Sequence, residues 1–423
     1  MSTAPIAPPV EERPALPAGF AAGGATAGIK ASGRPDLGIV AVTSTEPATA
    51  AAIFTLNLVQ AAPVRLSRAH LAASGGRARG IVVTSGCANA ATGPEGDTDQ
   101  AEVAAAIGTA LGCPTDQVLL ASTGLIGTRL PVASVQAGIG PLAASLSAGD
   151  DGLAAFATAM MTTDTRLKAA TASIALRSDD HVSARSVRVT GVAKGVGMLH
   201  PRMATMIAVL LTDAAASAEL LGELLRDASA ASFEQTTVDG DTSTNDTVFL
   251  LASGASSAAA PEPGSREAAL LGAAIGAVCR SLARQQAADG EGATTLVTCE
   301  VGGASDLVDA RAVSRAVVRS SLVKAAVHGR DPNWGRVAAA AGAALRPDGT
   351  PVRLHVDALR IAIAGHAVFA GAPLPFDAAA ASTAMDGPEL LIELDLGEGA
   401  ASAEAFGCDL TEAYVLENSA YST

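Results

Sequence analysis

Runs of aliphatic residues that lead into small residues recur in the first third of the chain. Residues 81–83 read Ile-Val-Val and residues 118–120 read Val-Leu-Leu, and the loops that follow contain Ser85-Gly86 and Ser122-Thr123-Gly124. Apolar runs of this length, rich in branched side chains, are typical of buried strands. The pattern predicts two strands whose ends deliver loops to a site.

Apolar residues at helical spacing predict helices between and after these strands. Residues 101–111 and 213–233 follow this pattern, and the second segment carries a stripe of leucines behind Asp213, a suitable helix cap. Residues 390–396 alternate well enough to predict a strand. We therefore expect layers of helices and sheets, without the regular βαβ period of a doubly wound sheet and without an internal repeat.

Three stretches rich in alanine and other small residues predict exposed turns or linkers. They are residues 145–153, 253–264 and 378–384. The N-terminal residues 1–18 contain five prolines and lack the basic start and apolar run of a secretory signal, so we expect them to form a disordered lead-in.

The composition narrows the class of protein. A chain of 423 residues is long enough for two domains or two closely packed halves. A net charge of −14 argues against nucleic acid and anionic membranes as partners, because phosphate binding needs clustered Lys and Arg. The apolar run 268–279 is too short to span a membrane, and five scattered cysteines indicate free thiols in the cytoplasm. Small-molecule chemistry fits best.

One threonine near the middle of the chain is a candidate nucleophile. In the segment 194–206, Thr205 follows the small residue Ala204. If the chain were cut between them, the free α-amine of Thr205 would take the proton from its own hydroxyl. By itself the segment 203–211 also fits a buried apolar element in which the hydroxyl bonds a nearby carbonyl.

Motifs across nearly the whole chain resemble the ornithine acetyltransferase family, also called the glutamate N-acetyltransferase or ArgJ family. The matching segments are residues 19–20, 27–30, 35–37, 85–90, 121–127, 161–165, 194–214, 238–247, 289–294, 329–336 and 417–423. The resemblance implies a layered α/β fold of the DmpA/ArgJ-like, N-terminal-nucleophile type with a second, smaller α/β domain. It also implies cleavage between Ala204 and Thr205, into a chain of residues 19–204 and a chain of residues 205–423.

The resemblance further implies an activity and its residues. Thr205 would accept an acetyl group from N2-acetyl-L-ornithine and pass it to L-glutamate by a ping-pong mechanism in arginine biosynthesis, with Thr123 and Gly124 as the oxyanion hole. The substrate-binding residues would be Thr162, Lys194, Thr205, Glu291, Asn418 and Thr423. Lys194 suits a carboxylate and Glu291 an ammonium. Taken singly, these charges also fit a solvated surface, and the last residues fit a frayed tail.

No cofactor or metal is implied. The segment 239–250 begins like a calcium loop but has Thr244 and Leu250 where Gly and Glu are needed. Residues 194–197 lack the third glycine of a dinucleotide loop and the Gly-Lys-Ser/Thr of a phosphate loop. The six histidines have no metal-ligand spacing. Acetyl-CoA as a second donor and assembly of two copies of each fragment are possible within the family.

Four positions depart from the family's usual residues and leave the donor and acceptor preference open: Thr84, Cys87, Arg202 and Thr295. Two alternatives to the transferase also remain. One is an amidase or aminopeptidase that gives the acyl group to water, and the other is an uncut relative that binds amino acids without catalysis.

Overall fold

The computed structural model describes residues 6–178, 183–200 and 206–420. Its strands form three sheets. The seven-stranded sheet has the order β1 (Val10–Glu11), β8 (Lys168–Arg177), β9 (Ala184–Lys194), β10 (Ile207–Thr212), β11 (Thr247–Ala252), β4 (Ala48–Phe54) and β5 (Arg77–Ala78). The four-stranded sheet has the order β2 (Phe20–Ala25), β3 (Leu37–Val42), β6 (Gly80–Cys87) and β7 (Val118–Leu125).

These two sheets pack face to face. Successive side chains of a strand point to opposite faces of its sheet, so each sheet has one face for the other sheet and one for helices. Ile207, Val209 and Leu211 of β10 pack with Ile81 and Val83 of β6 in one buried cluster. The helices on the outer faces are α2 (Gly93–Leu111), α3 (Val132–Ala144), α5 (Ala218–Ala230) and α6 (Arg266–Ala288). α1 (Ala62–Ala73) and α4 (Asp150–Met160) pack into the cluster between the sheets.

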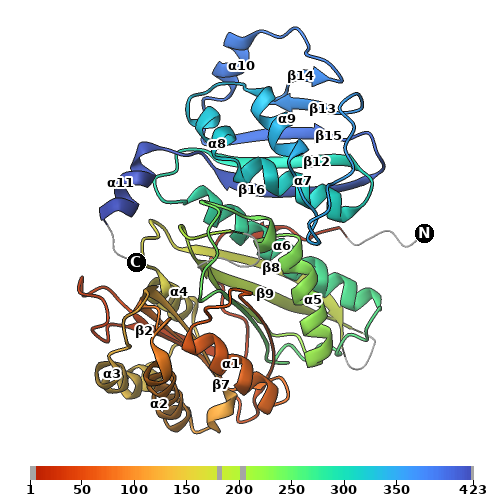
Figure 1. Cartoon of the computed structure of the whole chain (residues 1–423). Helices are drawn as coiled ribbons and strands as arrows, with labels where there is room; N and C mark the ends of the chain where they lie inside the picture. Colours follow the sequence, from red (N-terminus) through yellow and green to blue (C-terminus); the bar gives the residue numbers. More distant parts are fainter. Residues whose placement is uncertain (1–5, 179–182, 201–205, 421–423) are drawn as a thin grey trace.

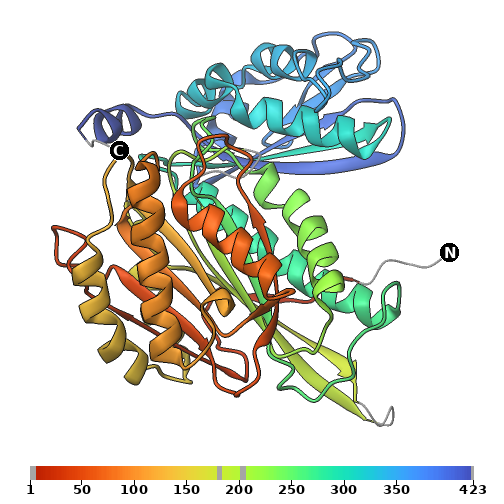
Figure 2. The ribbon, with the colours of Figure 1, turned by 60° about the horizontal axis from the view of Figure 1, so that its bottom comes forward.

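Each sheet also buries its other face against helices. Ala208 and Leu210 of β10 pack in a cluster with α5 and α6, whereas Val82 of β6 packs with α2 and α3. Helices therefore enclose the pair of sheets from both sides, and Figure 2 shows α2 and α3 on the side of the strands opposite α5. This is the layered α/β architecture that the sequence predicts.

The second, smaller α/β unit lies beside this body (Figure 1). Its five-stranded sheet has the order β14 (His366–Ala370), β13 (Arg360–Ile363), β15 (Glu389–Asp395), β12 (Leu296–Ala304) and β16 (Ala401–Cys408). Its helices are α7 (Leu307–Arg319), α8 (Ser321–His328), α9 (Trp334–Gly342) and α10 (Ala378–Ala384), and α11 (Glu412–Ala420) follows β16. Leu296 and Phe406 of this unit join the cluster beneath α6, so the two units share a core.

The strands at 81–83 and 118–120, the helix at 101–111 and the strand near 390–396 are confirmed as parts of β6, β7, α2 and β15. The stretch 253–264 contains no helix or strand, as expected. Among the helices of the described ranges, none combines the length and the apolarity that crossing a membrane requires.

Other expectations were wrong in part. Asp213 does not cap α5, because Ser217 accepts the Leu220 N–H while Asp213 accepts the Arg188 N–H. Residues 378–384 form α10, capped by Asp377, because alanine favours helices once a cap is present, and α4 begins within 145–153.

The expectation of a disordered lead-in is wrong for its described part. β1 pairs with β8, and the side chains of Ala15 and Leu16 are buried. The leading segment therefore completes the edge of the seven-stranded sheet, since prolines are compatible with an edge strand.

Candidate active site

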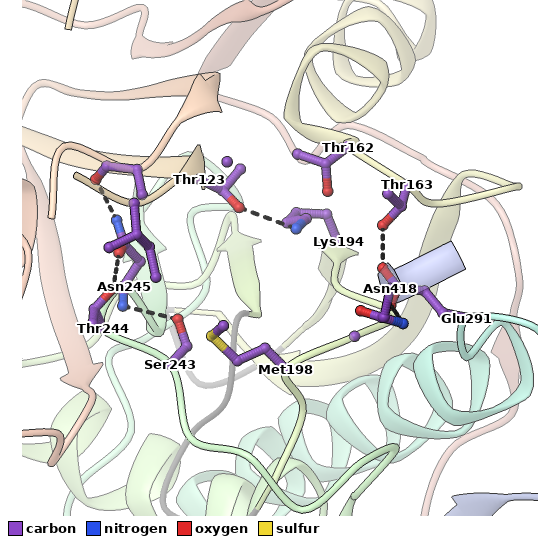
Figure 3. A pocket seen from close by; sticks show the side chains of 14 residues that line it. Thr123, Thr162, Thr163, Lys194, Met198, Ser243, Thr244, Asn245, Glu291 and Asn418 are labelled. Carbon is purple, nitrogen blue, oxygen red and sulfur yellow. Dashed lines mark hydrogen bonds between the residues drawn. The ribbon is translucent and has the colours of Figure 1, made fainter. Parts of the chain in front are cut away.

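Six of the predicted site residues surround one cavity, although they come from five separate parts of the chain (Figure 3). The six are Thr123, Gly124, Thr162, Lys194, Glu291 and Asn418. The cavity and its mouth hold about 640 Å³ of empty space, which includes open solvent. Three further predicted residues, Ala204, Thr205 and Thr423, lie outside the described residues, as does Arg202.

Thr123 and Gly124 stand at the end of β7, where it runs parallel to β6. Gly124 has a φ of +129°, and a Cβ there would lie 2.3 Å from the carbonyl carbon of Gly86. Only glycine permits this approach, because any side chain would collide with the neighbouring backbone. The close contact fixes the backbone at the rim of the cavity.

Lys194, the last residue of β9, reaches the same rim from the other sheet. Its Nζ donates to the Thr123 hydroxyl oxygen at 3.1 Å, and both side chains are buried. Burial lowers the pKa of the Lys194 ammonium, while the carboxylate of Asp164 opposes that effect. An oxyanion-hole candidate and a cation are thus in direct contact.

A buried ion cluster supports this cation. Lys168 Nζ lies 2.7 Å from Asp164 Oδ1 and 2.5 Å from Asp289 Oδ2. Asp164 also accepts the backbone N–H groups of Gly195 and Thr162. Burial tends to raise the pKa of Asp164, but the ammonium groups of Lys194 and Lys168 outweigh it and lower that pKa to about 2. The cluster ties the Thr162 loop to the end of β9.

Glu291 forms the opposite wall of the cavity. Its Oε1 accepts the Thr163 hydroxyl at 2.8 Å, and its Oε2 accepts the Asn418 amide of α11 at 2.9 Å. A Cβ at Gly197 would lie 2.3 Å from Oε2, so glycine makes room for the carboxylate. The carboxylate is half-buried and oriented, which suits an ammonium ligand.

The described chain resumes after position 205 at Met206, whose N–H donates to Asp246 Oδ1 at 3.1 Å. Burial raises the pKa of Asp246 well above its usual range. The Met206 N–H and the Lys194 ammonium favour the charged form, whereas the Thr55 hydroxyl donates to the Ser243 carbonyl oxygen. Asp246 Oδ2 has no hydrogen-bond partner in the described part of the chain.

The cavity is also lined by four polar residues for which the sequence predicted no role: Thr163, Ser243, Thr244 and Asn245. Asn245 donates to the backbone oxygens of Ala88 and Ser122 and so joins three loops. All four fall within segments 161–165 and 238–247, which match the motifs of the family. Their place in these motifs was the one feature of the sequence that could have marked them as cavity residues.

Three of the four departures from the family pattern, Thr84, Cys87 and Thr295, lie outside the cavity lining. Thr84 shares a hydrogen bond with the Ser122 hydroxyl, and Thr295 donates to the Gly387 oxygen. The Cys87 thiol donates to the Thr128 oxygen, and burial raises its pKa, as expected for a packing residue. A ligand that contacts only the lining residues would therefore not touch any of these three side chains.

Cation, carboxylate, amide and hydroxyl groups on one cavity suit a zwitterionic, amino-acid-like ligand. Within the described ranges, no three His, Cys, Asp or Glu side chains are grouped to hold a metal ion. The geometry therefore defines a polar small-molecule site with a candidate oxyanion hole.

The chain belongs to the ArgJ family, since the sequence model of that family matches residues 21–423. It is 45% identical over 422 residues to the arginine biosynthesis bifunctional protein ArgJ of Thermosynechococcus vestitus, and 44% identical over 417 residues to that of a Synechococcus strain. Each match covers 96% of both chains. A solved ornithine acetyltransferase from Mycobacterium tuberculosis, in complex with ornithine, is 37% identical, with a TM-score of 0.41 over 46% of this chain and 97% of its own.

Proposed function

We propose that this ArgJ family member is an acetyltransferase of arginine biosynthesis that moves the acetyl group of N2-acetyl-L-ornithine to L-glutamate through an ester on Thr205. Membership of the family over nearly the full length carries the proposal. The cavity supports it, because its groups complement an amino acid with a free ammonium and a carboxylate. No metal or organic cofactor takes part in the proposed reaction.

The first half-reaction forms the ester. The Thr205 hydroxyl oxygen attacks the acetyl carbonyl, the C–N bond breaks, and ornithine leaves with the proton that the Thr205 amine took from the hydroxyl. In the second half-reaction the glutamate amine attacks the ester, the C–O bond breaks, and Thr205 recovers its proton. Each attack places negative charge on the acetyl oxygen, which the Thr123 hydroxyl and Gly124 N–H would stabilise.

The nucleophile becomes available through self-cleavage. The Thr205 hydroxyl attacks the Ala204 carbonyl, the acyl group shifts from nitrogen to oxygen, and water hydrolyses the ester. Upstream of the predicted cut, Gly195 has a φ of +133° and Met198 a φ of +49°. A non-glycine residue at positive φ indicates a constrained turn.

Denaturing gel electrophoresis tests the cleavage. Fresh protein should give two fragments, each of roughly half the mass, and N-terminal sequencing of the second should read Thr-Met-Ile-Ala. The Thr205→Ala chain should remain whole. A wild-type chain that remains whole and binds ornithine would favour the non-catalytic alternative.

A second assay separates the transferase from a hydrolase. The protein is incubated with N-acetylornithine, and the release of ornithine is compared with and without glutamate. We expect N-acetylglutamate in amounts equal to the ornithine released, whereas free acetate as the main product would indicate an amidase. Replacing N-acetylornithine by acetyl-CoA tests the second donor, and light scattering tests whether two copies of each fragment assemble.

A further inference from the structure

Lys194 makes a contact that the binding of a substrate carboxylate would not require. Its Nζ donates to Thr123 Oγ1 at 3.1 Å, across 71 residues of sequence (Figure 3). The side chain of Lys194 is buried, with 2% of the residue exposed. In the described part of the chain this is the only hydrogen bond of the Lys194 ammonium, and the Thr123 hydroxyl donates to no acceptor.

The direction of that bond matters for the oxyanion hole. The carboxylates of Asp164 and Glu291 favour the charged form of Lys194. As an ammonium it has no lone pair, so the Thr123 oxygen accepts and its own proton points elsewhere. Thr123 is buried at the cavity wall, and the cavity is the space that its hydroxyl borders. A hydroxyl whose oxygen accepts from a cation is also a stronger donor, because hydrogen bonds in a chain polarise one another.

The surroundings hold Lys194 in this position. Gln286 donates its side-chain amide to the Lys194 carbonyl oxygen at 2.9 Å, and Lys194 pairs with Ile207 across β9 and β10. The next residue, Gly195, donates its N–H to Asp164. Both sides of the lysine backbone are therefore anchored, and the burial of the side chain restricts where Nζ can lie.

We propose that Lys194 is a positioning residue for the oxyanion hole, which aims the Thr123 hydroxyl proton into the cavity and strengthens it as a donor to the acetyl oxygen. This role rests on the proposed function and adds to it, because it gives Lys194 a contact with the proposed oxyanion donor Thr123. The two roles of the lysine differ in what they change. A carboxylate contact that is equal in the ground and transition states affects KM, whereas support of the oxyanion affects kcat.

A double-mutant cycle separates the roles. The variants are Lys194→Met, Thr123→Val and the pair, since methionine and valine keep most of the side-chain shape and remove the polar group. The kcat and KM for N-acetylornithine with glutamate are measured per mole of cut chain. Each single variant should lower kcat by about 100-fold, the typical loss of an oxyanion donor. In the Thr123→Val background, removing Lys194 should cost less than about threefold, because coupled residues are not additive.

Lys324→Met is the matched control. Lys324 is also buried, donates to the backbone oxygen of Cys408 and does not line the cavity. Its loss should lower the melting temperature without lowering kcat per cut chain. If Lys194→Met and Thr123→Val cut too slowly for kcat to be measured, their rates of self-cleavage replace kcat in the same cycle.

Three results would overturn the role of Lys194. They are a change confined to KM, a loss of kcat that is as large without the Thr123 hydroxyl as with it, and cleavage that fails in Lys194→Met but proceeds in Thr123→Val. A wild-type chain that stays whole or transfers no acetyl group would instead defeat the proposed function itself. The two failures are therefore distinguishable.

Discussion

Adding one methyl group at Gly124 should disable the proposed oxyanion hole. The Cβ of Gly124→Ala would lie 2.3 Å from the Gly86 carbonyl carbon and 2.6 Å from the Cys87 nitrogen, and both atoms belong to the backbone. Unstrained carbon atoms approach to about 3.5 Å, so the ends of β6 and β7 must separate by roughly 1 Å. The φ of +129° adds strain for any residue with a side chain.

The expected loss follows from that displacement. Losing one oxyanion donor costs roughly 3 to 4 kcal/mol, or about 100-fold to 1,000-fold in kcat. A misplacement of about 1 Å is enough for a loss of this order. We therefore expect Gly124→Ala to lower kcat by at least about 100-fold, with a smaller change in KM. The assay is the release of ornithine from N-acetylornithine in the presence of glutamate, per mole of cut chain.

Gly127→Ala provides the control. Gly127 also has a positive φ, +79°, but a Cβ there would meet no atom within 4 Å. The control carries the backbone strain, about 1 to 2 kcal/mol of stability, without the collision. Equal kcat values for the two variants would refute the reasoning, because the contact between Gly124 and Gly86 would then not control the site.

Three other predictions concern the supporting groups. Asp164→Asn should lower the free energy of unfolding, measured in urea at pH 7, by about 2 to 4 kcal/mol, because it unbalances a buried ion cluster. As a control, Asp99→Asn should lower it by less than about 1 kcal/mol, because the partner Arg129 is half-exposed. Similar losses for the two variants would contradict this. Since the folded pKa of Asp164 is lowered to about 2, its contribution of roughly 2 kcal/mol is present above pH 4 and should fade as the pH falls toward 2, measured as the difference from Asp164→Asn. Glu291→Gln should raise KM for N-acetylornithine about tenfold or more, and an unchanged KM would exclude an ammonium contact.

The order of strands in the seven-stranded sheet predicts that the two fragments stay together after cleavage. β10 lies between β9 and β11, and the predicted cut falls between β9 and β10. The two fragments would therefore share one sheet, and gel filtration without denaturant should show them eluting together. Separate elution would mean that the pairing of β9 with β10 does not survive cleavage.

Local patterns in the sequence were sufficient for the elements whose burial is uniform. The aliphatic runs at 81–83 and 118–120 became strands because both faces of each strand are covered, one by the other sheet and one by helices. Predictions failed where a single cap or edge pairing decided the outcome. Ser217 started α5 in place of Asp213, Asp377 turned an alanine-rich stretch into α10, and β8 ordered the leading segment.

By itself, the sequence determined the family, the layered α/β class and six residues that line the cavity, because those depend on motifs and on the periodicity of apolar residues. Only the tertiary structure decided that Lys194 meets Thr123, and that Lys168 joins Asp164 to Asp289. The physical reason is that contacts between charges and hydroxyls on different strands depend on how the sheets stack and on which side chains lose their water. Neither is encoded in the spacing of residues along the chain.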